Sequence, residues 1–174
     1  MSIAIRVARP SDAAAIATIY MPYVTDTVIS FEMAPPDKAE MANRLAKTLA
    51  RFPWLVAESD GEVVGYAYAE QLRDRPAYRF TCENSIYVRA DRVGQGLGKA
   101  LLRELCERCE SLGFRQMIAV IGGGEPSSIA LHQSCGFEVV GRLSSVGWKK
   151  GRWLDTVYMQ RALGHGAETS PSNI

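Results

Sequence analysis

Three glycines within five positions, Gly94, Gly96 and Gly98, mark the stretch of this sequence best suited to holding a ligand. An apolar run at 85–88 enters this loop, and a pattern with leucines at helical spacing leaves it. Glycine lets the backbone turn sharply and lets a ligand approach the amide groups. The first amides of a helix have no partner within the helix, and the helix dipole is positive there. The sequence therefore predicts an anion site, most often a phosphate site, at the start of this helix.

Two other phosphate loops do not fit these residues. A Walker loop needs a serine or threonine after Gly-Lys, but Gly98-Lys99 is followed by Ala100. A dinucleotide-binding loop reads G-x-G-x-x-G and is followed by an acidic residue at the end of the next strand. Here the loop reads G-x-G-x-G, and the next apolar run, 116–121, ends in three glycines.

Composition excludes several classes of partner. The 20 Lys and Arg residues nearly balance the 19 Asp and Glu residues, which gives no electrostatic case for nucleic acid or an anionic membrane. No apolar run reaches the length of a membrane span, and the first residues alternate like a strand rather than a signal peptide. The four cysteines are typical of reduced packing thiols in a cytoplasmic protein, and no metal site is expected.

The element order in the chain predicts the fold class. The patterns give the order β-α-α-β-β-β-α-β-α-β-β, which indicates a mixed sheet with helices on its faces, an α/β or α+β layered domain. Val139-Val140 and 146–148 suggest a strand pair, and Ser127 and Ser128 are expected to cap a short helix over 127–135. We expect a single domain over 1–163 and a disordered tail over 164–174.

The glycine loop resembles the Q/R-x-x-G-x-G/A pyrophosphate loop of the GNAT acetyltransferases, with Val93 in place of the first residue. Other segments are similar to the phosphinothricin N-acetyltransferase branch of that family, so that the resemblance covers nearly all of 3–163. It implies the GNAT fold, with a mostly antiparallel sheet, and acetyl-CoA as co-substrate. These segments are 52–57, 60–63, 65–69, 75–78, 81–83, 131–132 and 149–155.

The resemblance also implies which residues hold coenzyme A. Most contacts come from main-chain amides, so the loss of one side chain at position 93 should leave the site intact. Glu125 stands where relatives have an asparagine, and it is not counted as a cofactor residue. The expected cofactor-binding residues are Ile86, Tyr87, Val88, Val93, Gly94, Gln95, Gly96, Leu97, Gly98, Lys99 and Ser128.

Amine acetylation also needs a base and a proton for the departing thiolate. Glu83 stands where this branch has its general base, although a glutamate on a solvated strand face is the alternative. His132 is the candidate proton donor or substrate contact; a packed histidine is the alternative. Arginine suits the acidic groups of an acceptor. The expected substrate-binding residues are Phe31, Arg75, Tyr78, Arg79 and Trp153; packing roles remain open for Phe31 and Trp153.

These observations lead to one functional prediction and two alternatives. The prediction is a cytoplasmic acetyl-CoA-dependent enzyme that acetylates the α-amino group of a glutamate mimic, namely phosphinothricin, arsinothricin or methionine sulfoximine, and so confers resistance. The resemblance also implies a homodimer. The first alternative is a GNAT enzyme acting on another small amine or on a protein N-terminus. The second is a CoA-binding sensor domain without turnover.

Overall fold

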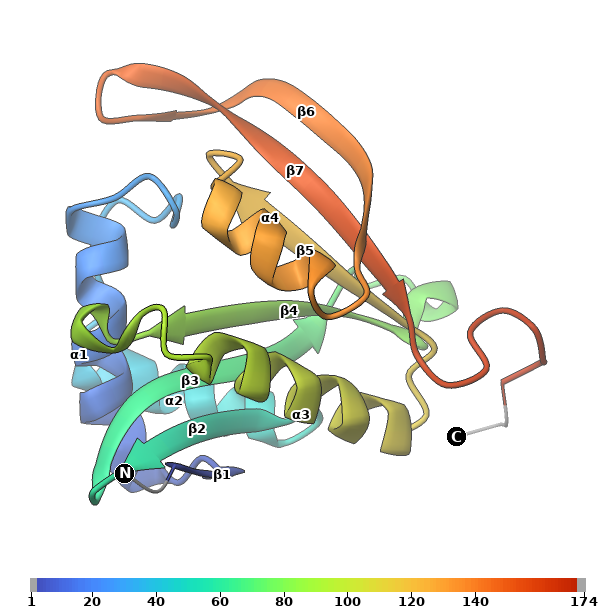
Figure 1. Ribbon diagram of the computed structural model, residues 1–174, viewed down its shortest axis with the longest axis horizontal. Helices are drawn as coiled ribbons and strands as arrows, with labels where there is room; N and C mark the ends of the chain where they lie inside the picture. Colours follow the sequence, from blue (N-terminus) through green and yellow to red (C-terminus); the bar gives the residue numbers. More distant parts are fainter. Residues whose placement is uncertain (1–2, 172–174) are drawn as a thin grey trace.

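A single seven-stranded sheet forms the centre of the computed structural model, which describes residues 3–171 (Figure 1). The strand order is β1-β2-β3-β4-β5-β7-β6, and every neighbouring pair is antiparallel except β4 and β5. The strands are β1 Ile3–Val7, β2 Trp54–Ser59, β3 Glu62–Gln71, β4 Thr81–Val88, β5 Gln116–Gly122, β6 Glu138–Lys149 and β7 Arg152–Ala162. The α-helices are α1 Ala13–Thr25, α2 Lys38–Leu49, α3 Leu97–Ser111 and α4 Pro126–Gln133. Short 3-10 turns lie at Pro10–Asp12, Pro76–Tyr78 and Ala90–Arg92.

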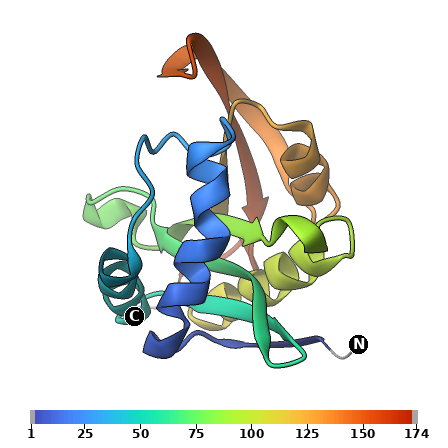
Figure 2. The same ribbon diagram turned by 90° about the vertical axis from the view of Figure 1, so that its left-hand side faces the viewer.

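The helices cover both faces of the sheet, as the layered class predicted (Figures 1 and 2). Helices α1 and α2 pack on one face over an apolar cluster that includes Trp54, Tyr66 and Tyr87. Helix α3 packs on the other face over a second cluster, around Leu101, Leu105 and Met117, and α4 lies beside it. A residue on a strand therefore faces either the α1–α2 side or the α3–α4 side, depending on its place in the alternation.

Local sequence signals mark the start of α2 and the end of α3. Asp37 caps α2 by accepting a hydrogen bond from the Glu40 amide, with an oxygen–nitrogen distance of 2.8 Å. Gly113 follows α3 with a φ of +88°, the left-handed conformation that favours glycine after a helix. The cap of α4 differs from the prediction. Glu125, not Ser127 or Ser128, occupies the cap position and accepts from the Ser127 amide, because the helix begins one residue earlier, at Pro126.

Strands β4 and β5 run together only over their first halves. Their pairing extends from Thr81 opposite Gln116 to Asn84 opposite Ala119, and no pairing between them follows. In Figure 1 the two ribbons start side by side and then diverge, with α4 beside β5. We call this divergence, between 85–88 and 120–122, the splay. It leaves the outer edge of β4 without a neighbouring strand at the centre of the sheet.

The end of the chain forms one long hairpin rather than the predicted extra strand pair. The two apolar runs at 139–140 and 146–148 belong to a single strand, β6, which pairs with β7 on both sides of two irregular positions, 140 and 144–146. Register shifts after Val139 and after Leu143 absorb the irregular residues between the runs. At the hairpin tip, the ammonium of Lys149 donates to the carbonyl oxygens of Val24 and Ser30, at 2.7 and 2.6 Å.

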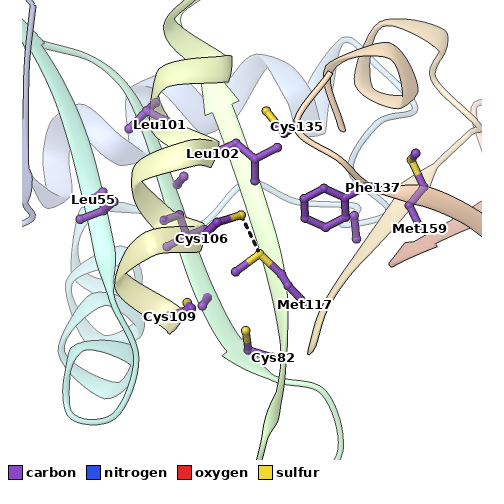
Figure 3. Packing of buried hydrophobic residues seen from close by; sticks show 14 of the residues in the cluster. Leu55, Cys82, Leu101, Leu102, Cys106, Cys109, Met117, Cys135, Phe137 and Met159 are labelled. Atoms are coloured by element: carbon purple, nitrogen blue, oxygen red, sulfur yellow. Dashed lines mark hydrogen bonds between the residues drawn. The ribbon is translucent and has the colours of Figure 1, made fainter. Parts of the chain in front are cut away.

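All four cysteines are free and buried. They pack among leucines and methionines between α3 and the sheet, and the Cys106 thiol lies 3.8 Å from the sulfur of Met117 (Figure 3). Burial raises the pKa of Cys106 to about 12, which keeps the thiol protonated and unreactive. The cysteines are therefore core residues, as predicted.

Residues 164–171 form turns beyond β7, and the guanidinium of Arg115 donates to the Thr169 hydroxyl at 2.9 Å. Part of the expected tail is thus in contact with the domain, and 172–174 lie outside the described residues. The division at position 163 stays a prediction. Within the described range, none of the helices is long and apolar enough to cross a membrane.

Candidate active site

The glycine loop and the start of α3 line a hollow of about 480 Å³. Gly94 and Gly96 have φ values of +81° and +79°, so the loop requires the left-handed conformation that glycine adopts without strain. A Cβ added at either position would meet no protein atom within 4 Å, which means that the space in front of the loop is open. The hollow is lined by Tyr23, Ile29, Ile86, Val88, Arg92, Val93, Gly94, Gly96, Leu97, Gly98, Lys99, Glu125, Ser127, Ser128, Ala130 and Leu131.

Most of the predicted cofactor-binding residues line this hollow, and Tyr87 lines a smaller one beside it. Gln95 is the exception, because its side chain turns back and donates to the Asp91 carbonyl oxygen at 3.3 Å. Ser127 and Glu125 also line the hollow although neither was predicted to. The open glycine loop, the free first amides of α3 and the nearby Lys99 fit an anionic phosphate group.

The splay points backbone groups of β4 toward this space. The Arg89 amide donates to the Val64 carbonyl, so Val88 and Gly65 form a non-hydrogen-bonded pair within the β3–β4 ladder. Hydrogen-bonded and non-hydrogen-bonded pairs alternate, and Ile86 opposite Ala67 is therefore of the same kind. The peptide groups of Ile86 and Val88 consequently face away from β3, toward the splay. Such outward amides suit the binding of an extended amide chain and the polarisation of a thioester carbonyl.

A second, narrower hollow of about 50 Å³ lies in the splay itself. Ile29, Ile86 and Ser128 line both hollows, so the two adjoin. The narrow hollow is also lined by Asn84, Ser85, Tyr87, Ala119, Val120, Ile121, Gly122 and His132. The larger hollow therefore leads from the glycine loop to the point where β4 and β5 separate.

Glu83 lies two residues before the splay, on the α1–α2 side of the sheet. It is half-buried and stands directly across the β3–β4 ladder from Glu70. Burial, with a smaller contribution from the negative charge of Glu70, raises the pKa of Glu83 to about 7 against the opposing charge of Arg73. A carboxyl with a pKa near neutrality suits a general base at neutral pH.

His132 lies on the opposite side of the sheet from Glu83. Its side chain is only 2% exposed, and its Nε2 is 3.0 Å from the Oδ1 of Asn84, on the same strand as Glu83. Adjacent strand residues point to opposite faces, so the two candidate catalytic residues flank the splay from the two sides. Burial lowers the pKa of His132, while a contact with the Ser128 carbonyl raises it.

Three of the predicted substrate residues lie together at the start of β4. Arg75, Tyr78 and Arg79 line a separate hollow of about 340 Å³, together with Thr81. Thr81 and Glu83 share a face of β4 and are about 7 Å apart along the strand. The Arg79 guanidinium lies over the Phe80 ring at 4.4 Å, whereas the Arg75 side chain makes no hydrogen bond or ion pair within residues 3–171. The arginines thus lie at the start of the strand that carries Glu83, and they do not line the splay.

The other two predicted substrate residues have packing contacts. The ring of Phe31 is wedged between Gly122 of β5 and Gly147 of β6, where a Cβ on either glycine would collide with it. Phe31 therefore holds the 26–37 segment against the sheet, and its ring is still 39% exposed. Trp153 is 62% exposed, packs edge-on against Trp148 with ring centres 5.2 Å apart, and lines none of these hollows.

Two residues at the site carried no sequence signal. Tyr23, on α1, donates from its hydroxyl to the Val88 carbonyl oxygen at 2.6 Å and lines the larger hollow. Asn84 contacts His132 and also donates to the Ile118 carbonyl at 3.1 Å. Neither residue belongs to a motif, and only the folded chain brings them to the splay.

A sheet opened between two parallel strands, with a glycine loop at the mouth of the opening, defines an acyltransferase that takes its acyl group from a coenzyme A thioester. The comparisons with known proteins agree. Residues 5–158 match the model of the acetyltransferase (GNAT) domain, and the chain belongs to this family. The co-substrate of the family is acetyl-CoA. No group of three or more metal-ligating side chains occurs among the described residues.

Several characterised relatives cover almost the whole chain. A phosphinothricin N-acetyltransferase of Alcaligenes faecalis is 51% identical over 169 residues, 96% of this chain and 86% of the relative. An L-methionine sulfoximine/L-methionine sulfone acetyltransferase of Pseudomonas aeruginosa is 43% identical over 165 residues, 92% of this chain and 94% of the relative. A crystal structure of a GNAT phosphinothricin acetyltransferase from Sinorhizobium meliloti with AcCoA superposes with a TM-score of 0.96, at 50% identity, covering 99% of this chain and 95% of that one.

Proposed function

We propose that this chain transfers an acetyl group from acetyl-CoA to the α-amino group of an amino acid that mimics glutamate. The observation that carries the proposal is the splay, flanked by Glu83 on one side and reached from the glycine loop on the other. The substrate class comes from the relatives, which are named for phosphinothricin and for methionine sulfoximine. Arsinothricin, with the same amino-acid skeleton, is included in the proposal.

In this proposal, residues on the two sides of the sheet carry out different steps of the reaction. Acetyl-CoA supplies an activated thioester when bound. The amides at the start of α3 and Lys99 would hold its phosphates, and the outward peptide groups of Ile86 and Val88 would align its amide arm along the edge of β4. Glu83 would receive the proton of the amine on the α1–α2 side, and His132 would face the departing sulfur from the α3–α4 side.

The pKa of Glu83 sets the expected pH range. A folded-state pKa of about 7, above the ordinary value, means that the carboxylate form needed for proton removal becomes populated only as the pH rises through neutrality. The acceptor amine also loses its proton as the pH rises. Both effects have the same sign, so activity should increase from acid toward mildly alkaline pH.

The arginine-lined hollow suits the acidic end of the acceptor. Arg75 and Arg79 offer planar donors for carboxylate, phosphinate or arsinate oxygens, and Tyr78 adds a hydroxyl. An acceptor whose acidic end is held there would have to extend its amino group along β4 to reach Glu83 and the splay. This arrangement favours a small anionic amino acid over a protein N-terminus.

A thiol-release assay tests the proposal. The purified protein is mixed with acetyl-CoA and, separately, with phosphinothricin, methionine sulfoximine, arsinothricin and glutamate. We expect turnover with the glutamate mimics and far lower turnover with glutamate. An absence of thiol release with every acceptor, in a protein that still binds acetyl-CoA, would instead favour a CoA-binding sensor.

We also propose a cytoplasmic homodimer. Strand β6 is at the edge of the sheet and exposes apolar side chains, which favours a second copy as its neighbour. The four buried free thiols favour a reducing compartment. Sedimentation velocity should give a dimer mass; a single monomer species at assay concentrations would contradict it. The exposed apolar residues of β6 are Val139, Val140, Leu143, Val146 and Trp148.

A further inference from the structure

A neutral imidazole ring at His132 cannot donate a hydrogen bond to both of the acceptors that face its nitrogens. Nδ1 is 2.8 Å from the Ser128 carbonyl oxygen, and Nε2 is 3.0 Å from the Oδ1 of Asn84. The amide nitrogen of Asn84 is committed to the Ile118 carbonyl at 3.1 Å. Both ring nitrogens therefore face acceptors, but a neutral imidazole carries only one N–H.

Turning the Asn84 amide around does not remove the deficit. The NH₂ group would then face Nε2 and satisfy it, but Oδ1 would face the Ile118 carbonyl oxygen instead. Only the orientation with Oδ1 toward Nε2, together with a proton on each ring nitrogen, completes all three contacts. Asn84 is 5% exposed, so water cannot readily take over the missing contact.

Within residues 3–171, no charged side chain forms a hydrogen bond or ion pair with the ring. Its neighbours are Asn84, the Ser128 carbonyl and the edge of Phe137, with ring centres 5.0 Å apart. Strand β5 offers no ionisable group over 116–122. Among the charged residues on the surrounding elements, Glu83 points to the other face of the sheet. The others on these elements are Glu125 at the cap of α4 and, on α3, Lys99, Arg103, Glu104, Glu107, Arg108 and Glu110.

We infer that Asn84 is a positioning residue that holds His132 at the splay with a proton on each ring nitrogen, the form able to protonate a departing thiolate. This inference rests on the proposed acetyl transfer. Burial lowers the pKa of His132 and the Ser128 carbonyl raises it; the oxygen of Asn84, 3.0 Å from Nε2, also favours the doubly protonated ring by accepting the second proton's hydrogen bond. His132 and Asn84 both line the narrow hollow in the splay, so the proton is held where the sulfur would leave.

The protons balance over one turnover. The neutral amine nitrogen bonds to the carbonyl carbon, and the carbon–sulfur bond breaks with its electron pair on sulfur. Glu83 takes the proton from the amine nitrogen, and the proton on Nε2 passes to the sulfur. Glu83 is then neutral and so is His132. Glu83 returns its proton to solvent and His132 regains one, which restores the starting state.

The decisive measurement is the pKa of His132 by NMR titration of its imidazole signals in the protein without ligands. The sequence holds only two histidines, so a His165→Gln variant assigns the signals. Asn84→Leu, similar in shape and without the acceptor, should lower the pKa of His132 by about one unit, and Asn84→Asp should raise it by a similar amount. The same midpoint in all three proteins would overturn the inference.

Further measurements distinguish a change in the pKa of His132 from a loss of folding or of activity. Thermal melts show whether Asn84→Leu folds; if it does not, Asn84→Asp decides alone, and an unchanged pKa in that variant overturns the inference. In active protein, the alkaline fall of kcat should move to lower pH in Asn84→Leu and to higher pH in Asn84→Asp. Because the titration needs neither acetyl-CoA nor an acceptor, a failed thiol-release assay would refute the proposed function and leave the NMR result readable.

Discussion

The hydroxyl of Tyr23 occupies the place beside Val88 that strand β5 has left. It donates to the Val88 carbonyl oxygen at 2.6 Å and lies 3.4 Å from the Val88 amide nitrogen. Its ring packs edge-on against Tyr87 at 5.0 Å, which fixes the hydroxyl in position. Helix α1 thus supplies the hydrogen-bonding partner of the open strand edge and keeps the Val88 peptide aligned toward the larger hollow.

Tyr23→Phe should therefore affect the cofactor more than the acceptor. The ring packing is retained, but the Val88 carbonyl loses its donor, which should cost about 1 kcal/mol of stability. With the strand edge less fixed, the KM for acetyl-CoA should rise about three- to tenfold, while the acceptor KM stays unchanged. Steady-state kinetics with each substrate varied in turn checks this.

Tyr20→Phe is the matched control. Tyr20 lies on the same helix and in the same aromatic cluster, but its hydroxyl bonds to Ser30 and Glu32 and does not line the hollow. It should lose a similar amount of stability and keep its acetyl-CoA KM. Equal KM values in both variants and in wild type would show that Tyr23 has only a structural role.

Gly96→Val should impair acetyl-CoA binding. The residue has a φ of +79°, which strains any side chain, and a side chain there would enter the open space where phosphates are expected. We expect the acetyl-CoA KM to rise by a factor of about ten or more, as the loss of a phosphate contact would give. Isothermal titration with coenzyme A measures the binding directly.

The control for this variant is Gly61→Val, in the turn between β2 and β3. Gly61 has nearly the same φ, +81°, and the same open surroundings, but it lies far along the chain from the hollow. Both variants should melt at similarly reduced temperatures, and only Gly96→Val should lose coenzyme A affinity. Retained affinity in folded Gly96→Val would move the phosphate site elsewhere.

Arg75→Ala should weaken binding of the acceptor amino acid. The guanidinium makes no hydrogen bond or ion pair within residues 3–171 and lines the arginine hollow, so a charge-assisted pair with an acidic substrate is available to it. Its loss should cost about 2 kcal/mol of acceptor binding and leave the acetyl-CoA KM unchanged. Arg103→Ala, an exposed arginine on α3, provides the comparison. The arginine hollow is not the acceptor site if Arg75→Ala and Arg79→Ala both keep the wild-type acceptor KM within twofold.

The sequence predicted the parts of the fold that depend on neighbouring residues. The cap at Asp37, the glycine after α3 and the Asp60–Gly61 turn all follow from local chemistry, and all are present. The single long strand β6 was missed because its bulges interrupt the alternation, and only pairing with β7 reveals it as continuous. The prediction of the α4 cap was wrong because Pro126, next to the predicted cap, starts the helix one residue earlier.

The candidate site was predictable only as far as its motifs extend. The glycine loop is recognisable from a few consecutive residues. Glu83 and His132 were predicted from a resemblance between whole segments. The bond from Tyr23 to Val88 spans 65 positions in the chain, and the one from His132 to Asn84 spans 48. Such contacts depend on how the strands separate, which no local pattern encodes.

Glu83 is the residue on which the account depends most directly. Its pKa of about 7 places the change from acid to carboxylate in the neutral range, so wild-type kcat/KM for the acceptor should rise with pH through that range. Glu83→Gln keeps the shape and removes the proton acceptor. The chemical step should slow by roughly 10²–10⁴, the usual effect of a positioned base, with little change in acetyl-CoA binding.

The most direct test is a pH–rate profile of wild type and Glu83→Gln, with folding checked by thermal melts. The account predicts that wild type shows an acid limb with an apparent pKa near 7. Glu83→Gln should be slower and lose the limb near pH 7. Its rate should still rise as the amine deprotonates at higher pH, so the deficit should shrink there. A Glu83→Gln enzyme that keeps near-wild-type turnover and the same acid limb at neutral pH would contradict the role of Glu83 as the base.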